Sequence, residues 1–501
     1  MLAVLPLWIA GAQPADSNPA GAAAPSEADS ASNQTSSAPA DEIHWGSVVF
    51  SGSVRTRLEA WDWFEDSANG RYTISDSLIR LSLSQVLGNF DWQLEFAVPV
   101  LLDLPTNALA PAPQLQSGLG ANYYSANHNS TDAAMIFPKQ GFVRFKRLFD
   151  HDGESLRAGR FEFFDGAEVA PQDPTLAALK RDHVDQRLIG NFGFADVERS
   201  FDGAQYTAQG GALNLTVMSA LPTRGVFQVD GWGNLRTSVS YIGLTGQLPG
   251  KRSSSEWRLF GIYYDDFRHV LKTDNRPAAV RLADMDNIRI ETYGGHFINV
   301  TKTPSGPVDF TFWGAFQTGA WGRQADRAGA YDAEIGWQPH ILTRLRPWLR
   351  AGYTFGSGDK NASDGVHGTF FQLLPTPRVY ARYPFYNMMN LEDAAAELVF
   401  RPGKRLTLRS DAHSLRLASP YDLWYLGGGA FQPWTFGFTG RNAGGARSLA
   451  NVWDLSADYA FNAHFATGFY YGYAVGKAVL HKIYPDGPSS PYGFVELNYK
   501  F

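Results

Sequence analysis

The sequence predicts an all-β protein, a transmembrane antiparallel up-and-down β-barrel of about 18 strands. Three observations predict this fold. Apolar and polar residues alternate with period two from residue 46 onward. The connections between the predicted strands alternate in length, short and then long. The chain is rich in aromatic residues (34 Phe, 22 Tyr, 14 Trp), yet its mean hydropathy of −0.24 is slightly polar, as a wall with one apolar and one polar face requires.

The alternation is clear in the first predicted strand. Phe50, Val54 and Leu58 share one face, and Arg55 and Arg57 share the other. The same pattern recurs along the chain and predicts strands at residues 47–60, 74–86, 89–99, 139–148, 154–163, 199–208, 212–219, 234–247, 255–266, 290–302, 307–319, 327–338, 344–356, 390–401, 404–415, 450–461, 463–476 and 490–501.

The connections give the strongest argument for a membrane barrel. Short turns, such as Leu87–Gly88 and Pro402–Gly403, alternate with long segments. The long connections are 100–138, 164–198, 267–289, 357–389 and 416–449. Such barrels have short periplasmic turns and long outer loops, so we expect both termini in the periplasm. A soluble β-sandwich has no reason to alternate its loop lengths in this way.

Composition excludes several classes of protein. The 501 residues contain no cysteine, which excludes disulfides and cysteine-based zinc sites. The net charge of −6 gives no indication of nucleic-acid binding. No stretch after residue 13 reaches the roughly 18 apolar residues of a spanning helix.

The N-terminal region predicts targeting and disorder. Residues 1–12 are typical of the apolar core and cleavage region of a signal peptide, with Ala10 and Ala12 before the cleavage site. The first basic residue is Arg55, so the positive start of such a peptide is missing, which indicates a truncated start. The alternative is an ordinary buried segment. Residues 13–45 predict a disordered low-complexity tail, and residues 46–501 the barrel.

Aromatic residues near the predicted strand ends fit the interfacial girdles of a membrane barrel. They are Trp61, Trp63, Trp313, Trp321 and Trp337. The alternative is that they simply favour strands.

Charged residues on the face opposite the apolar one predict the lining of a lumen. The arginines are Arg55, Arg57, Arg80, Arg144, Arg157, Arg258, Arg346, Arg350, Arg405 and Arg409. The acidic residues are Glu59, Asp91, Glu95, Asp332, Glu334, Glu397, Asp411 and Glu496. Rings of arginine favour anions, and guanidinium groups match carboxylates, so this lining predicts a conduit for a polyanion. The alternative is an internal ladder of ion pairs that braces the wall.

Several motifs resemble the alginate-export family of outer-membrane barrels. They are SGSVRTRLEAW (51–61), LRAGRFEFFDG (156–166), RSFDGAQ (199–205), GYTFGSGDKNASDGVHGTFFQLLPT (352–376) and the closing FVELNYKF. The terminal Phe501 also resembles the signal that the barrel-assembly machinery reads.

The resemblance implies an 18-stranded barrel with a basic conduit for a polyuronate. By position it places these residues in the lumen: Arg55, Arg57, Arg157, Arg160, Arg199 and Asp202. Arg160 lies an odd number of residues after Arg157, so strict alternation puts the two on opposite faces, and a lumen position for both suggests a bulge. An outer loop, folded inward, would carry Asp359, Asp364, Gly365 and Phe370. A calcium site at Asp359 and Asp364 is a weak alternative, because the spacing lacks an EF-hand pattern. Alginate exporters also carry a long periplasmic loop late in the chain, and the turns predicted here are short.

The sequence therefore predicts a passive channel in the bacterial outer membrane for an anionic polysaccharide or oligosaccharide, with alginate-type export first. A small-solute uptake porin of the same fold is the alternative. A barrel enzyme is a distant one, since there is no GxSxG, HExxH or phosphate-loop motif. We expect no cofactor, no metal and no nucleic acid. The expected partners are membrane lipids, lipopolysaccharide, the anionic saccharide and the barrel-assembly machinery.

Overall fold

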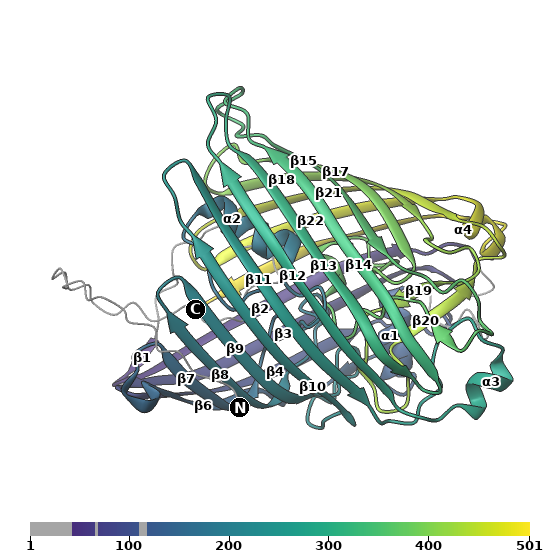
Figure 1. The fold of residues 1–501 in the computed structure, drawn as a ribbon, viewed down its shortest axis with the longest axis horizontal. Helices are drawn as coiled ribbons and strands as arrows, with labels where there is room; N and C mark the ends of the chain where they lie inside the picture. The colour runs from purple at the N-terminus through teal and green to yellow at the C-terminus, as the bar shows by residue number, and fades with distance from the viewer. Residues whose placement is uncertain (1–42, 66–68, 110–117) are drawn as a thin grey trace, which may run out of the picture.

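The protein is a closed antiparallel β-barrel of 18 strands (Figure 1), as the sequence predicts. The structure is a computed structural model that describes residues 43–65, 69–109 and 118–501. The wall strands are β2 (Val48–Asp62), β3 (Arg71–Leu87), β4 (Phe90–Leu102), β6 (Phe137–Lys146), β7 (Glu154–Phe161), β8 (Phe201–Gly210), β9 (Leu213–Pro222), β10 (Thr237–Leu248), β11 (Ser253–Asp266), β12 (Ile288–Thr301), β13 (Val308–Trp321), β14 (Gln324–Trp337), β15 (Trp348–Gly356), β17 (Leu391–Phe400), β18 (Leu406–Arg416), β21 (Ser448–Ala460), β22 (Phe465–Gly476) and β23 (Ser489–Lys500). Each predicted strand overlaps one of them.

The barrel closes where β2 meets β23. Ser53 faces Lys500 in the antiparallel register of this pair. Beyond it, the main-chain groups of Gly52 and Phe501 exchange two hydrogen bonds of 3.0 Å. Closure leaves no free edge among the 18 wall strands, which the hydrocarbon of a membrane demands. The predicted signal peptide and most of the predicted tail fall on residues 1–42, outside the described residues, and Ile43–Trp45 forms β1, paired with the start of β2.

The two ends of the barrel differ. The turn end carries the short connections, such as 88–89 and 211–212, and the loop end carries the long ones, such as 162–200 and 357–390. The expected alternation has one exception. The loop-end connection between β13 and β14 contains only Gly322 and Arg323, because the two strands continue their pairing up to Trp321 and Gln324.

The remaining elements lie in the connections. They are β5 (Ala133–Ala134), β16 (Val366–His367), the hairpin of β19 (Leu423–Gly427) and β20 (Phe438–Asn442), the helices α1 (Leu119–Ala126), α2 (Pro174–Leu179), α3 (Ala278–Ala283) and α4 (Ala478–Ile483), and the short turns η2 (Leu148–Asp150), η3 (Lys180–Val184) and η4 (Pro377–Val379). In the part of the chain that the structure describes, no helix is long and apolar enough to span a membrane.

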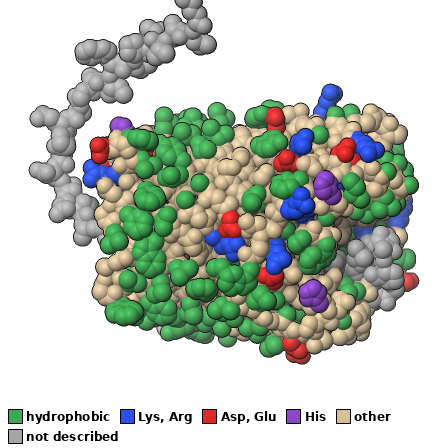
Figure 2. Space-filling model, turned by 90° about the horizontal axis from the view of Figure 1, so that it is seen from below, with side chains coloured by type: hydrophobic (Ala, Val, Ile, Leu, Met, Phe, Trp, Pro, Cys, Tyr) green, Lys and Arg blue, Asp and Glu red, His purple; other side chains and the backbone are tan. Residues whose placement is uncertain are grey.

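The outer face of the wall is apolar. Leu259, Phe310, Ile335 and Leu497 are among many large apolar side chains that it exposes. Figure 2 shows apolar side chains over much of one face, with most of its charged side chains in the right half, toward the loop end of Figure 1. This is the surface that lipid requires.

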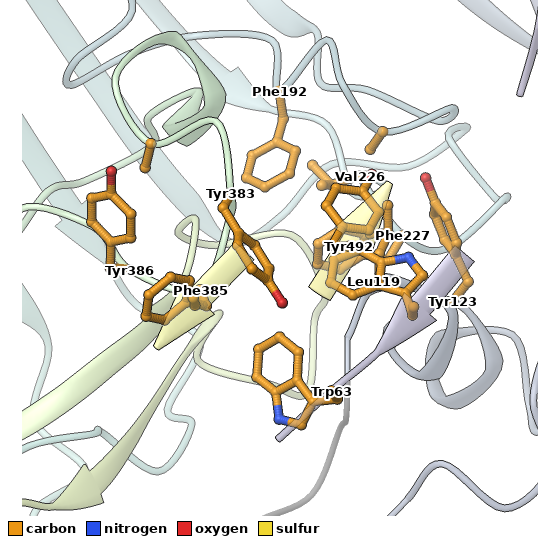
Figure 3. Packing of buried hydrophobic residues seen from close by; sticks show 14 of the residues in the cluster. Trp63, Leu119, Tyr123, Phe192, Val226, Phe227, Tyr383, Phe385, Tyr386 and Tyr492 are labelled. Carbon is orange, nitrogen blue, oxygen red and sulfur yellow. The ribbon is translucent and has the colours of Figure 1, made fainter. Parts of the chain in front are cut away.

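The expected tryptophan girdle is mostly wrong. Trp61, Trp63, Trp313 and Trp321 are at most 4% exposed and pack inside the barrel, and only Trp337 is exposed on the outer face. They are buried because the long loops fold into the barrel and give these rings partners there. Figure 3 shows one such cluster, in which Trp63, Leu119, Phe192, Phe227 and Tyr383 meet from five different connections.

Candidate functional site

The lumen is filled lengthwise by residues 162–200, which connect β7 to β8 and are called the inserted loop below. The loop leaves the wall at the loop end, yet its helix α2 lies near the turn end, away from α1, α3 and α4 (Figure 1). There Nε2 of Gln338, in the turn after β14, donates to Oγ1 of Thr175 at 3.2 Å. The inserted loop therefore occupies the path that a solute would take.

Local sequence explains the helix at the tip of the inserted loop. Asp173 precedes α2, and its Oδ1 accepts hydrogen bonds from the main-chain N–H groups of Thr175 (2.8 Å) and Leu176 (3.3 Å). Pro174 occupies the first turn, where its missing N–H group is not needed. Leu176 and Leu179 then turn inward and are buried.

Wall arginines on β2 hold one part of the inserted loop. Nη2 of Arg55 and Nη2 of Arg57 both lie 3.1 Å from Oδ1 of Asp196. Arg57 also approaches Asp76 on β3 (3.3 Å) and Glu496 on β23 (3.4 Å). A buried guanidinium among carboxylates is costly to separate from them, so this cluster fixes the loop to the wall.

A second cluster lies beside the first one. Arg80 contacts Glu95 on β4 (2.6 Å) and Glu162 (3.0 Å) and Glu198 (3.1 Å) of the inserted loop. Nζ of Lys139 on β6 contacts Glu162 at 3.1 Å and Glu198 at 3.2 Å. Burial opposes the ionisation of Glu162, but the charges of Arg80 and Lys139 outweigh it and lower the pKa of this carboxyl to about 2. Glu162 is thus ionised where the inserted loop meets β3 and β6.

A third contact lies on β11. Arg258 is 3.3 Å from Asp165 and 3.2 Å from Glu168, both in the inserted loop. Nζ of Lys180, from the same loop, lies 2.6 Å from Glu256 on β11. The inserted loop therefore contributes carboxylates to some of its ion pairs with the wall and a cation to another.

The fourth contact surrounds a cavity of about 70 Å³. Asp182 of the inserted loop lies 3.1 Å from Arg409 on β18, and Arg187 lies 3.0 Å from Asp332 on β14. His183 approaches Glu334 at 3.0 Å, and Glu334 also pairs with Arg350 at 2.5 Å. In this cavity arginine and carboxylate alternate.

Arg199 ends the inserted loop and joins three loops. It is fully buried, and its guanidinium donates to the carbonyl oxygens of Gly190 (3.0 Å), Leu374 (2.7 Å), Gly428 (3.3 Å) and Ala430 (3.4 Å). Burial lowers the pKa of Arg199 to about 9. The residue thus has a lumen position, as the resemblance implies, but its contacts are main-chain carbonyls.

Most of the remaining predicted conduit residues also lie on the inner face. Arg144 pairs with Asp91 at 2.9 Å, and Nη2 of Arg157 donates to Gln205. Arg144 and Arg157 line a cavity of about 200 Å³. Asp411 lies 3.5 Å from Arg382.

Four of the predicted lumen residues lie elsewhere. Arg346 and Arg405 are exposed in turns, because β15 begins only at Trp348 and β18 at Leu406. Arg160 and Asp202 form an ion pair of 2.7 Å on the outer side of the wall.

The strand around Arg160 keeps its register. Arg157 and Phe161 share the inner face, with the guanidinium 4.5 Å from the ring centroid, so Arg160 points the other way. Its guanidinium also donates to the carbonyl oxygens of Gly231 (2.9 Å) and Trp232 (3.0 Å), which fastens the loop 223–236 to the outside of the barrel. The expected bulge is absent from this described pair.

The loop with Asp359 and Asp364 shows turn geometry. Oδ1 of Asp359 accepts from the N–H group of Asn361 at 2.9 Å, and Oδ1 of Asp364 accepts from that of Val366 at 2.9 Å. Asp359 is buried and Asp364 is exposed, so their side chains do not converge. Phe370 is buried against Trp313, so this loop does fold inward.

Sequence reasoning missed the loop side of each contact, namely Glu162, Asp165, Glu168, Asp182, His183, Arg187, Asp196 and Glu198. A signal was present. The inserted loop contains Leu188, Ile189, Phe192 and Val197, and an exposed loop has no need of so many apolar residues. All four are at most 8% exposed.

A larger cavity of about 340 Å³ opens at the loop end and is called the vestibule below. Its aromatic lining consists of Trp61, Trp63, Phe192, Phe194, Phe227, Phe431, Trp434, Phe436 and Phe438. Arg378 is the cation of the lining among the described residues.

The sequence matches the family model described as Alginate export over residues 47–482. No curated protein matches the chain. Among solved structures it is similar to a BenF-like porin from Pseudomonas fluorescens Pf-5, with a TM-score of 0.55, 8% identity and coverage of 91% of this chain and 98% of that one. It is also similar to OccK9 (OpdG) from Pseudomonas aeruginosa (TM-score 0.53, 10% identity, 91% and 98% coverage) and to OccAB4 from Acinetobacter baumannii (0.52, 9%, 94% and 100%).

Proposed function

This chain belongs to the alginate-export family and is an outer-membrane barrel with the fold of porins, and on that premise we propose that it is a passive channel for an acidic oligosaccharide. One observation carries the proposal. Arginines from β2, β3, β11 and β18 each hold a carboxylate of the inserted loop, at 3.0–3.3 Å. A wall that binds its own carboxylates around its circumference has the chemistry to bind those of a uronic-acid chain.

Net charge does not supply the preference for anions. Among the described residues, buried acidic side chains outnumber buried basic ones. Selectivity would therefore come from exchange, in which carboxylates of the solute replace those of the inserted loop on the same arginines. The loop then acts as a plug that an acidic solute displaces.

The proposed orientation has the turn end and both termini in the periplasm. The contrast between short connections at one end and long ones at the other supports it, since outer-membrane barrels carry their long loops outside. Lipid and lipopolysaccharide would cover the apolar outer face, and the barrel-assembly machinery would insert the chain. In this proposal the barrel catalyses no reaction.

A small-solute uptake porin is the second candidate. Three cavities lined by described residues, of about 70, 200 and 340 Å³, suit a small acid better than a threaded polymer. One neighbour of the same fold is described as OpdK with vanillate, which is a small carboxylate.

Conductance in a planar bilayer separates these candidates. A salt gradient gives the ion selectivity from the reversal potential, and uronate oligomers and neutral glucose oligomers of matched length are then added. We expect anion selectivity and block by the uronate oligomers at concentrations at which the neutral oligomers have no effect. Anion selectivity without uronate block would favour the small-solute porin, and cation selectivity would overturn both.

A further inference from the structure

The vestibule differs from the rest of the interior in its lining. The lumen below it alternates arginine with carboxylate, whereas the vestibule is mostly apolar and aromatic. Its walls come from the end of β2 and the residue after it, from α1, from the inserted loop and from the loops 223–236, 267–287, 357–390 and 417–447. Trp63, Leu119, Phe192 and Phe227 are seen around this region in Figure 3.

Arg378 stands out in this lining because it forms no ion pair with a carboxylate of the described residues. It lies on aromatic rings, 4.1 Å from the centroid of Phe194, 4.5 Å from Tyr470 and 5.1 Å from Phe494. Its Nη1 donates to the carbonyl oxygen of Arg382. No carboxylate of the described residues lies within 4.0 Å of its guanidinium, whereas Arg80 has three such partners.

A half-buried arginine without a carboxylate keeps donors available for an anion. Aromatic rings hold the guanidinium plane in place, so little order is lost when it binds. Neutral polar side chains are also present in the lining, among them Asn122, Ser125, Gln432 and Thr435. These could bond a substituent of a ligand without competing for its charge.

We propose that the vestibule is a binding site for a small carboxylic acid that carries an apolar ring, with the carboxylate on Arg378 and the ring among the aromatic residues. The volume of about 340 Å³ is within the usual range of ligand pockets, about 300–1,000 Å³. A sugar acid would leave many hydroxyl groups against apolar walls, which is unfavourable. The inference rests on the proposed channel and favours its second candidate, the small-solute porin, because it names the class of solute that the entrance binds.

Binding to the purified, detergent-solubilised barrel tests the site directly. Benzoate is the probe, benzamide is the neutral isostere and glucuronate is the polar ring acid, and calorimetry or ligand-observed NMR gives the dissociation constants. We expect benzoate to bind at least tenfold more tightly than benzamide or glucuronate, which corresponds to one charged hydrogen bond or more. Equal binding of benzoate and benzamide, or tighter binding of glucuronate, would overturn the proposal.

The variant Arg378→Gln removes the charge and keeps a similar length. We expect it to lose benzoate affinity about tenfold or more and to retain the affinity for benzamide, which shows that the cavity is still formed. Arg323→Gln is the matched control, because Arg323 is exposed in the loop-end hairpin next to β14. Unchanged benzoate affinity in Arg378→Gln would overturn the assignment of Arg378.

The two proposals fail in different ways. A barrel that shows anion selectivity and uronate block but does not bind benzoate keeps its channel function and loses the vestibule site. A barrel that binds benzoate but does not conduct keeps the site and loses the channel function.

Discussion

Arg57 on β2 and Asp196 in the inserted loop form a buried ion pair of 3.1 Å although 139 residues separate them in the chain. Both side chains are fully buried. Asp196 also pairs with Arg55 at 3.1 Å, so two arginines of β2 hold the inserted loop at this residue. Ion pairs therefore link the inserted loop to the wall, and single substitutions can test each of these links.

Replacing Asp196 by Asn should loosen the inserted loop. Removing one partner of a buried ion pair costs about 3–5 kcal/mol, and here the loss of the carboxylate affects both Arg55 and Arg57. We expect more frequent or larger openings in single-channel recordings. Asp152→Asn is the control, since Asp152 pairs with Arg147 in an exposed turn. Identical recordings from Asp196→Asn and the control would contradict the role of this pair.

Acid should open the channel in a defined range of pH. The pKa of Glu162 is lowered to about 2 from its ordinary 4.5, so its contribution is complete above about pH 4.5 and is lost as the pH falls toward 2. We therefore expect the open probability to rise below about pH 4.5. Burial raises the pKa of Asp165 and of Asp185, so protonation of these two carboxyls in acid favours the closed loop instead. The deciding comparison is therefore between Glu162→Gln and the unchanged protein. The variant should open more at pH 7 and respond less to acid. An equal acid response in both proteins would count against Glu162.

Replacing Arg199 by Met should release three loops without opening the wall. Four carbonyl oxygens would lose a buried donor, at about 1–3 kcal/mol for each group left unsatisfied. We expect protease to cleave within 162–200, 357–390 or 417–447, while the barrel keeps its resistance to unfolding by SDS at room temperature. Arg323→Met serves as the exposed control. Loops that stay resistant in Arg199→Met would show that Arg199 does not hold them.

Replacing Gly159 by Ala should destabilise the wall itself. Gly159 has a φ of +127°, and an added Cβ would lie 2.3 Å from the carbonyl oxygen of Gly141 on the neighbouring strand. Strain of this kind costs about 1–3 kcal/mol, before the clash is counted. The temperature at which the barrel unfolds in SDS should fall. Gly403→Ala, in an open turn with nothing within 4 Å, should leave it unchanged. Equal unfolding temperatures would refute the argument.

The wall could be predicted from the sequence because it depends on local alternation. Arg57, Arg80 and Arg350 lie inside for the same reason that Leu58 and Leu349 lie outside. Parity alone does not say where a strand begins, and so it misplaced Arg346, whose neighbour Pro347 precedes β15. Alternation assigns Arg160 to the outer face, where it pairs with Asp202, and only the family resemblance had placed it in the lumen.

The plug could not be predicted, because its contacts join residues that are far apart in the chain. Nothing local to Asp196 indicates a partner 139 residues away, and nothing local to Leu374 indicates Arg199. The same limit applies to the vestibule, whose lining is collected from several connections.

The position of Arg57 has a consequence for how the molecule is made. The arginine lies on β2, one of the two strands that meet when the cylinder is completed, and it touches both Asp196 of the inserted loop and Glu496 of β23. The Arg57 guanidinium therefore stabilises both the junction of β2 with β23 and the position of the inserted loop. A nascent sheet that has not yet joined β2 to β23 lacks one of the carboxylates around this charge, and a chain whose loop is still outside lacks another. Packing of the interior and completion of the cylinder thus stabilise each other, which favours assembly in a single cooperative step.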